Sequence, residues 1–391
     1  MNNSSLQVFA FICTNSPSTK LVAQTYTRWV GRSLDNVFVA IKLHLLTCLI
    51  SSGLIFYSAS ATAADPQQEI LLFLDVSQNQ HIRGSSIDDD FIPALDLIYG
   101  YSTDKFRLLT EYAISSEENE IERLQAGWVI NDENVLWIGR VHTPDNYWNT
   151  TFHHGQFLQT SISRPWLDRF EDEGGPLIGH TTGLLLESDY QLNNGAGFSS
   201  KVAVGAGPHL ESDLEPFDLA SPGKSHKLTA QVSIAYIPQY LSSNQFGILA
   251  SRSDISVSTQ NSVAFSNISQ NIFGVFVDWS WNKSRVISAF RNITNRANNN
   301  NQDSFWGAYV HVERSLTSRW TSYGRFDYLN GEDDSEYLGL LEQTSSRQLT
   351  GGLRFDLTNK HAITIEVIDI SATNGRLNRT NILVQWSASL L

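Results

Sequence analysis

Cysteine and methionine are nearly absent from this chain of 391 residues, which contains two Cys and one Met. Charged residues are also scarce, at 17%, where a soluble domain has about 25%. Only one apolar run approaches the length of a membrane-spanning helix, which excludes a polytopic helical membrane protein. Basic residues are the minority, and a net charge of -13 argues against a nucleic-acid partner. Two classes of protein remain: a soluble all-β protein, and a β-barrel in which apolar positions alternate with polar ones.

The N-terminal part of the chain has the pattern of a secretory signal peptide. Basic side chains precede an apolar stretch, Leu43–Tyr57, which is followed by small residues that end at Ala63 and Ala64. Signal peptidase recognises this order, and we expect cleavage after Ala63 or Ala64. An anchor helix is the alternative, but the apolar stretch is short for one. The predicted organisation is a leader and signal peptide over 1–63 and a β-barrel over 64–391.

Residues 1–36 form an unusually long leader, and Met1 is the only methionine in the chain. A mis-set start is therefore predicted, with initiation at a codon other than Met near Leu34 or Val37. Both cysteines, Cys13 and Cys48, lie in the segment to be removed, so the exported chain has neither a disulfide nor a thiolate metal site. Removal of residues 1–63 leaves 328 residues with 23 basic and 39 acidic side chains, a net charge of -16.

Apolar and polar residues alternate repeatedly through the exported part, and we find no convincing helical periodicity there. The clearest example is the stretch 382–390, where Ile, Val, Trp, Ala and Leu occupy every second position. The clearest stretches run about 9–11 residues, the length of a tilted strand that crosses a bilayer. A soluble sandwich has the same alternation, so this pattern alone leaves both classes open.

The lengths of the connections separate the two classes. Short turns are predicted at 103–105, 131–134, 192–196, 239–244, 282–284, 317–319 and 358–360. Between them lie mostly longer loops, at 80–90, 115–120, 142–180, 205–226, 252–268, 293–303, 330–346 and 371–379. Short turns at one end and longer loops at the other are typical of an outer-membrane barrel. The sequence therefore predicts an all-β fold, a transmembrane antiparallel β-barrel of about 16 strands, with both termini on the short-turn side.

This architecture resembles the porin-like barrels of Gram-negative outer membranes over the whole exported chain. The block that begins at His153 and ends at Gly175 is similar to one in uncharacterised proteobacterial outer-membrane proteins. The last residue is Leu391, where such proteins usually end in Phe or Trp. The resemblance implies an outer-membrane location, contact with membrane lipid and lipopolysaccharide, insertion by the barrel-assembly machinery, and a homotrimer. It also implies that the third long loop, 142–180, folds into the lumen and narrows it.

Ionisable residues recur at the polar positions of the alternating stretches. A barrel of this size has a water-filled lumen, in which such side chains are solvated or paired with neighbours. Taken together, they would set the ion preference of a pore. The predicted lumen-wall residues are Arg107, Glu111, Arg123, Arg140, Arg325, Asp327, Arg354, Asp356 and Glu366, with Arg285 and Arg291 in the same set.

Loop 142–180 is the predicted constriction. A structureless loop of 39 residues is uncommon, and the aromatic residues of this one need packing partners. The predicted constriction residues are Asp145, His153, His154, Arg164, Asp168, Arg169, Glu171, Asp172 and Glu173. The five acids outnumber the two arginines and give the loop a net charge of -3. Acids that face arginines on the wall would create a transverse field that favours polar solutes over apolar ones.

Four of the ten histidines also lie in this loop, and His153, His154 and His180 are candidate metal ligands together with the neighbouring acids. Their spacing is not diagnostic, and hydrogen-bonded structural histidines are the favoured alternative. No cofactor is expected. Ser, His and Asp are available in the loops, but no spacing fixes a nucleophile beside a base, so we expect no enzymatic activity.

The function that follows most directly is a channel for the passive diffusion of small polar solutes and ions. The alternative is a substrate-specific outer-membrane channel, or a ligand- or metal-binding receptor, that uses loop 142–180. Blocking of the ion current by one solute would favour the alternative.

Overall fold

The computed structural model describes residues 67–390, with gaps at 84–89, 116–118, 153–155, 172–173, 212, 218, 220–225, 259–265, 300, 332–334, 342–344 and 372–377. The predicted signal peptide and its cleavage site lie outside the described residues. Both remain predictions.

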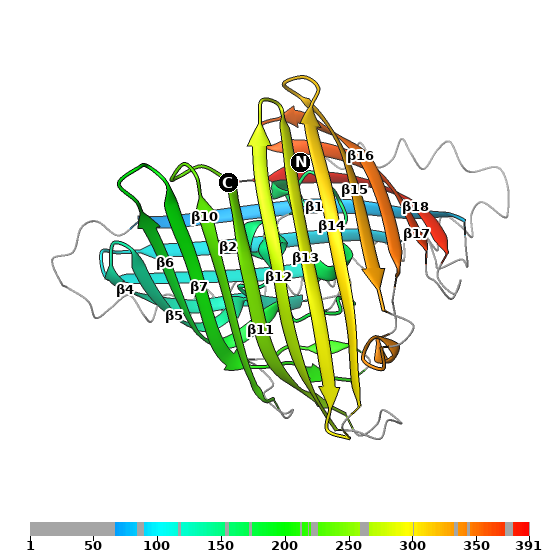
Figure 1. Ribbon diagram of the computed structural model, residues 1–391. Coiled ribbons are helices and arrows are strands. Elements are labelled where there is room, and N and C mark those ends of the chain that lie inside the picture. Colours follow the sequence, from blue (N-terminus) through cyan, green and yellow to red (C-terminus); the bar gives the residue numbers. More distant parts are fainter. Residues whose placement is uncertain are drawn as a thin grey trace, which may run out of the picture. The chain divides into compact units, whose positions relative to one another are not determined.

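Strands make up most of the described chain (Figure 1). The long ones are β1 (Gln67–Arg83), β2 (Asp90–Ser102), β3 (Phe106–Ser115), β4 (Asn119–Asn131), β5 (Asn134–His142), β6 (His180–Gln191), β7 (Gly197–Ala206), β10 (Leu228–Ile237), β11 (Gln245–Val257), β12 (Asn267–Trp281), β13 (Ser284–Ala297), β14 (Gln302–Ser315), β15 (Trp320–Asn330), β16 (Arg347–Thr358), β17 (His361–Ser371) and β18 (Arg379–Ser389). Each pairs antiparallel with the next, and β7 pairs with β10.

The sheet closes on itself because β1 pairs with both β2 and β18. Phe73, for example, lies opposite Asp96 on one side and Ser389 on the other. The predicted all-β barrel of 16 antiparallel strands is confirmed. Closure leaves no unpaired sheet edge, as a strand structure in a membrane requires.

The seven predicted short turns lie between consecutive strands, and both described ends of the chain lie on that side of the barrel. At the other end the strands extend into segments that were predicted as loops. The segment 293–303 is one example, because β13 continues to Ala297 and β14 begins at Gln302. Turn residues mark the tight connections clearly, whereas the polar ends of strands resemble loops in sequence.

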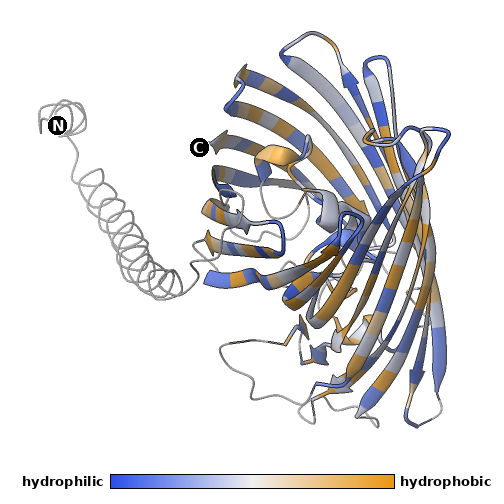
Figure 2. Ribbon diagram, turned by 90° about the vertical axis from the view of Figure 1, so that its left-hand side faces the viewer, coloured by the Kyte–Doolittle hydropathy of each residue, from blue (hydrophilic) through white to orange (hydrophobic). Residues whose placement is uncertain are grey.

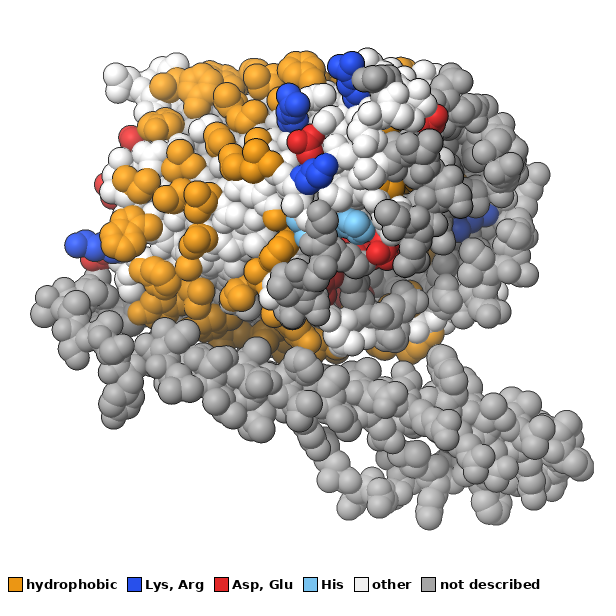
Figure 3. Space-filling model, turned by 90° about the horizontal axis from the view of Figure 1, so that it is seen from below, with side chains coloured by type: hydrophobic (Ala, Val, Ile, Leu, Met, Phe, Trp, Pro, Cys, Tyr) orange, Lys and Arg blue, Asp and Glu red, His pale blue; other side chains and the backbone are white. Residues whose placement is uncertain are grey.

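Apolar side chains cover the outer face of the barrel. Phe273 is 57% exposed and Ile365 is 50% exposed, whereas Gln270 and Glu366 on the same two strands are buried on the inner face. The alternation is visible along the ribbons in Figure 2, and Figure 3 shows hydrophobic side chains gathered over the left part of the view with few charged ones among them. An outer face of this kind is suited to lipid.

The remaining elements are short and lie within the longer connections. They are α3 (Tyr147–Phe152), η1 (Gln156–Leu158), η2 (Trp166–Asp168), β8 (His209–Leu210), β9 (Leu214–Glu215) and η4 (Leu338–Leu340). Among the described residues, no helix is both long and apolar enough to cross a membrane.

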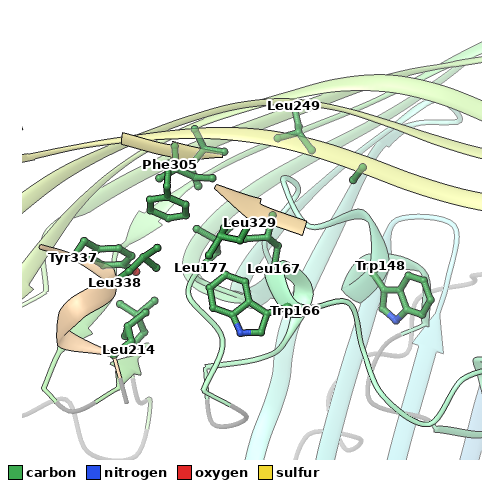
Figure 4. Close-up of a cluster of buried hydrophobic side chains, with 14 of the residues drawn as sticks. Trp148, Trp166, Leu167, Leu177, Leu214, Leu249, Phe305, Leu329, Tyr337 and Leu338 are labelled. Atoms are coloured by element: carbon green, nitrogen blue, oxygen red, sulfur yellow. The ribbon is translucent and has the colours of Figure 1, made fainter. Parts of the chain in front are cut away.

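One sector of the inner face is apolar, which the sequence analysis did not predict. Ile272 on β12, Ile293 on β13 and Phe305 on β14 are buried there, against side chains from the loops such as Leu167 and Tyr337. Figure 4 shows this cluster between the sheet and the short loop elements. In this sector β12–β14 are thus apolar on both faces, and the inner apolar side chains need the loops as packing partners.

Three glycines lie side by side where β5, β6 and β7 pair: Gly139 opposite Gly183, and Gly183 opposite Gly205. A Cβ on any of them would come within 2.3 Å of a backbone oxygen of a neighbouring strand. Gly139 also has a φ of +134°, which side chains rarely adopt. This row of glycines lets the three strands approach closely just before loop 142–180 begins.

Gly139→Ala is therefore expected to destabilise the barrel by more than about 1 kcal/mol. Its Cβ would lie 2.0 Å from the backbone oxygen of Leu124. Gly324→Ala is the matched control, since the nearest atom to that Cβ is 3.8 Å away. Urea unfolding of the two variants in lipid vesicles measures the difference. Equal unfolding midpoints would contradict the prediction.

Candidate functional site: the loop across the lumen

Residues 143–179 connect β5 to β6 and carry α3, η1 and η2. Their contacts reach inner-face side chains on β1 and on β12 to β17, and they return to the ends of β5 and β6. The loop therefore has partners around much of the inner circumference. Most of the contacts described below join loop residues to strands far away in the sequence.

The first contact lies between α3 and the wall at β12. The hydroxyl of Tyr147 donates to Oδ2 of Asp278 at 2.6 Å, and its ring stacks on Phe276 with centroids 4.6 Å apart. Arg285 donates to both oxygens of Asp278, at 2.8 and 2.6 Å. Burial and the nearby carboxylate raise the pKa of the Tyr147 hydroxyl, so it stays a donor at neutral pH.

Trp148 anchors the same helix by packing. Its ring is fully buried and stands edge-on to Tyr309 and His311 of β14. Its Nε1 donates to the side chain of Gln159 further along the loop, at 2.9 Å. The helix is thereby joined both to the wall and to the next part of the loop.

The loop then reaches another part of the wall, at β1 and β16. Phe157 of η1 stacks with Phe73 of β1, with centroids 6.4 Å apart. Arg354 of β16 donates to the carbonyl oxygens of Phe157 and Gln159, at 2.8 and 2.7 Å, and pairs with Asp356 at 2.9 Å. An inner-face arginine thus satisfies backbone groups of the loop that would otherwise lack partners.

The segment 161–166 is bound most extensively. Both carboxylate oxygens of Glu366 accept backbone N–H groups, from Ile162 and Ser163 at 3.0 Å each. Arg325 donates to the carbonyl oxygens of Ser163 and Arg164, at 2.7 and 2.8 Å.

The neighbouring Asp327 completes this set. It accepts the backbone N–H of Trp166 at 3.1 Å through one oxygen, and the other lies 2.9 Å from Nε of Arg325. These are charge-assisted hydrogen bonds, which are stronger than neutral ones.

A buried ion pair joins η2 to β13. Oδ1 of Asp168 lies 2.5 Å from Nη1 of Arg291, and the two side chains are at most 1% exposed. Asp145 lies nearby, and its burial raises the pKa of that carboxyl despite Arg291. Loss of one partner of this pair would leave an uncompensated buried charge, which destabilises a fold.

The loop ends in a second buried cluster. Glu171 accepts the backbone N–H groups of Gly179 and His180 through Oε1, at 2.6 and 2.9 Å. Nδ1 of His180 lies 3.2 Å from Oε2 of Glu171, and its Nε2 lies 3.2 Å from Oε2 of Glu122 on β4. The ring of Phe170 stacks on His180 with centroids 5.0 Å apart.

Burial alone raises the pKa of Glu171, but His180 and the backbone N–H groups together hold it below its ordinary value of 4.5. A lowered pKa in the folded state means that this carboxylate stabilises the loop fully above about pH 4.5. The contribution is lost as the pH falls through the lower, folded value. We expect amide hydrogen-exchange protection of residues 174–180 to drop in that acid range. Glu171→Gln should show no such step, and an identical step in the variant would contradict the prediction.

Of the other predicted wall residues, Glu111 and Arg123 pair with each other, whereas Arg140 pairs with acids that were not predicted. Glu111 and Arg123 are 2.5 Å apart and buried. Arg140 pairs with Glu120 and lies 3.8 Å from Glu122. Arg107, in contrast, is exposed near the short turn before β3. On the loop itself, Arg169 donates to Gln348 of β16 at 3.1 Å, and the guanidinium of Arg164 lies 4.3 Å from the centre of the Phe170 ring.

Four predicted constriction residues, His153, His154, Asp172 and Glu173, lie outside the described residues. Among the described ones there is no group of three or more potential metal ligands. His180 has carboxylate and aromatic neighbours, as a structural histidine does.

Sequence reasoning missed Asp278 and Tyr323, of which the latter donates to Glu366 at 2.8 Å. Both residues occupy inner-face positions of their strands. The alternation of inner and outer positions along the sequence was the signal that could have identified them.

Two of the predicted wall arginines contact the loop directly. Arg325 and Arg354 donate to carbonyl oxygens of the loop, and Glu366 accepts its N–H groups, so these charges are neutralised where the loop is held. The expected arrangement of loop acid against wall arginine is present at Asp168 and Arg291. The transverse field remains a prediction, and it now depends most on Asp172 and Glu173.

Comparison with protein-family models gives no match, and comparison with curated proteins gives none either. Solved structures of outer-membrane proteins are similar in fold. An anion-selective porin from Comamonas acidovorans has a TM-score of 0.56 at 9% identity, covering 83% of this chain and all of that one. The trimer form of OmpT from Vibrio cholerae has a TM-score of 0.55 at 9% identity, with 83% and 100% coverage. The channel DcaP of Acinetobacter baumannii has 0.54 at 8%, with 85% and 100% coverage.

At these identities the likeness concerns the fold. The chain has the fold of the outer-membrane porins, a closed barrel of 16 antiparallel strands, as its sequence predicted.

Proposed function

We propose that this protein is a porin-like channel of a Gram-negative outer membrane, through which small polar solutes and ions diffuse. One observation carries the proposal: a closed barrel has an apolar outer face and ionisable groups on its inner face. An apolar outer face fits lipid, and a polar inner face fits a water path. The similarity in fold to an anion-selective porin and to the channel DcaP supports it.

The loop 143–179 is the constriction in this proposal. It is held on several strands of the wall, and Glu111, Arg291, Arg325 and Glu366 of the inner face are at most 1% exposed. Because these inner-face side chains are covered, the path that remains beside the loop is narrow. We therefore propose that the channel has a small conductance and admits solutes of small size.

Conductance in planar lipid bilayers tests the proposal with purified protein. Stepwise ion currents that no solute blocks support general diffusion. Currents that one solute blocks at low concentration support the substrate-specific alternative. Absence of current from protein with the heat-modifiable gel mobility of a folded barrel would overturn both.

The ratio of cation to anion permeability tests whether the loop lies in the path of the ions. The exported chain has 39 acidic and 23 basic residues, and an acidic constriction favours cations. Replacement of Glu171, Asp172 and Glu173 by the corresponding amides should then lower the ratio of cation to anion permeability. An unchanged ratio would remove these residues from the constriction.

A homotrimer is part of the proposal, supported by the trimer form of the similar OmpT. Cross-linking in outer-membrane vesicles gives the number of copies. A monomer would leave the channel proposal intact.

A further inference from the structure

A small cavity lies at the long-loop end of the barrel, where β12, β13 and β14 meet the segment before η4. It has a volume of about 170 Å³. Its polar lining consists of three amides and two carboxylates, from Asn295, Asn301, Gln302, Asp303 and Glu336. In the proposed outer-membrane barrel this end faces the outside medium, because the longer loops of such barrels are external. A solute from outside therefore meets the cavity before it reaches the constriction.

The carboxylate of Asp303 is held from two sides. Asn295, which lies opposite it in the β13–β14 pair, donates through Nδ2 to Oδ1 at 2.8 Å. The backbone N–H of Tyr337 donates to Oδ2 at 3.3 Å. Each carboxylate oxygen has two lone pairs, so each keeps one for a further donor. Asp303 is thus a fixed acceptor that can bind an additional N–H group.

The two negative charges of the cavity are bound by neutral donors. Oε1 of Glu336 accepts an amide N–H from Asn301 at 3.1 Å, and both donors to Asp303 are neutral as well. Among the residues that the structure describes, neither carboxylate has a basic partner within 4 Å. Arg296 is close in sequence, but it alternates with buried residues and is exposed on the outer face of β13. A recess lined by charges of one sign concentrates counter-ions, so this cavity favours a cation.

The other part of the lining is apolar. Ile268 and Ala297 lie opposite each other in the β12–β13 pair and are buried, and Tyr337 completes this wall. Sites for drug-sized ligands have volumes of about 300–1,000 Å³, so this smaller cavity admits a small molecule or one group of a larger one. An ammonium group has three N–H donors and no acceptor. An ammonium group on a short alkyl chain therefore matches both parts of the lining.

Tyr337 connects the cavity to the loop 143–179. Its hydroxyl donates to the carbonyl oxygen of Pro176 at 2.6 Å. Its ring stacks on Phe305 of β14 with centroids 6.3 Å apart, and Figure 4 shows these two rings beside η4. A ligand in the cavity is thus separated from the loop by one side chain.

We propose that this cavity binds the ammonium group of small primary alkylamines and collects such solutes at the mouth of the barrel. The inference rests on the proposed channel function, for which it names a class of solute. The ammonium group donates to Asp303 and Glu336, and the alkyl chain lies against Ile268 and Ala297. Binding here raises the concentration of amines directly above the constriction.

Calorimetric titration of the purified, folded barrel in low-salt buffer tests the preference for charge. The probes are butan-1-amine, butan-1-ol and butanoate, which share one carbon chain and differ in the charge at its end. The amine is expected to bind at least about tenfold more tightly than the alcohol, because hydrogen bonds to charged groups are stronger than neutral ones. Butanoate should not bind. Equal affinities for the amine and the alcohol, or no binding of the amine, would overturn the proposal.

Two variants locate the binding. Asp303→Asn removes one charge at constant size and should weaken the binding of butan-1-amine about tenfold. Glu336→Gln should weaken it less, by about threefold, because this carboxylate is exposed and screened by water. Since Glu336 is exposed, its variant keeps the test valid if Asp303→Asn does not fold. Wild-type affinity in Glu336→Gln and in folded Asp303→Asn would overturn the site.

Asp104→Asn is the matched control, because it removes an exposed acid at the short-turn end of the barrel. Its affinity for butan-1-amine should equal that of the wild type. A loss as large as that of the cavity variants would assign the binding to the net charge of the protein and overturn the site.

Planar-bilayer recordings with the same proteins separate this proposal from the channel function. Amine binding that the cavity variants weaken, in a protein that gives no ion current, leaves the site in place and overturns the channel. Ion current from a protein that does not bind the amine overturns the site and leaves the channel in place.

Discussion

Arg325→Met should raise the single-channel conductance by at least about tenfold, because it releases the most firmly bound part of the loop. The guanidinium donates to Ser163 and Arg164 of the loop and also pairs with Asp327. Removing one partner of a buried ion pair costs about 3–5 kcal/mol. The segment 161–166 then loses its strongest contacts with β15, and the lumen widens.

Arg107→Met is the matched control for this experiment. It removes the same charge from a wall position, but Arg107 is exposed and belongs to the short-turn end. Its conductance should stay close to that of the wild type, with a change in ion preference at most. Heat-modifiable gel mobility verifies that both variants are folded. Equal conductance of the two variants would show that the contacts of Arg325 do not limit the path.

A disulfide between Leu167→Cys and Gly307→Cys should have the opposite effect and hold the loop on the wall. A Cβ at position 307 of β14 would lie 3.2 Å from Cγ of Leu167, close enough for disulfide geometry with small adjustments. Both native cysteines lie within residues 1–63, so a chain expressed from residue 64 onward offers no competing thiol. Oxidation is expected to slow the entry of small sugars into proteoliposomes by at least about tenfold.

The reduced form of the same protein is the control, and it should recover the faster rate after a thiol reductant is added. Each single cysteine variant should be insensitive to oxidation. If oxidised and reduced proteins admit sugars at the same rate, movement of η2 away from β14 has no part in solute passage.

The barrel could be predicted because its signals are local. The pair Asn282 and Lys283 indicates a tight turn from neighbouring residues alone. The alternation of apolar and polar residues along β18 can likewise be recognised within one strand. The lengths of the connections then separated a membrane barrel from a soluble sandwich. None of these steps required knowledge of which strands face one another across the lumen.

The site could be predicted only as a set of residue types. Glu366 and Ile162 are 204 positions apart, and no local pattern shows that a carboxylate on β17 accepts the N–H group of a loop residue. The inner apolar sector was hidden for the same reason. Ile272 reads as part of an apolar stretch, and only the position of the loop explains why an inner-face residue is apolar.

That apolar sector has a consequence for how the protein can be re-engineered. Excision of the loop is a common way to enlarge a pore, but here it would expose Ile272, Ile293 and Phe305 to water. The expected product is an aggregation-prone or collapsed barrel, because bare apolar surface of this extent favours association. The loop is in this sense part of the hydrophobic core, and the pore of this protein is better widened by loosening its contacts than by shortening its chain.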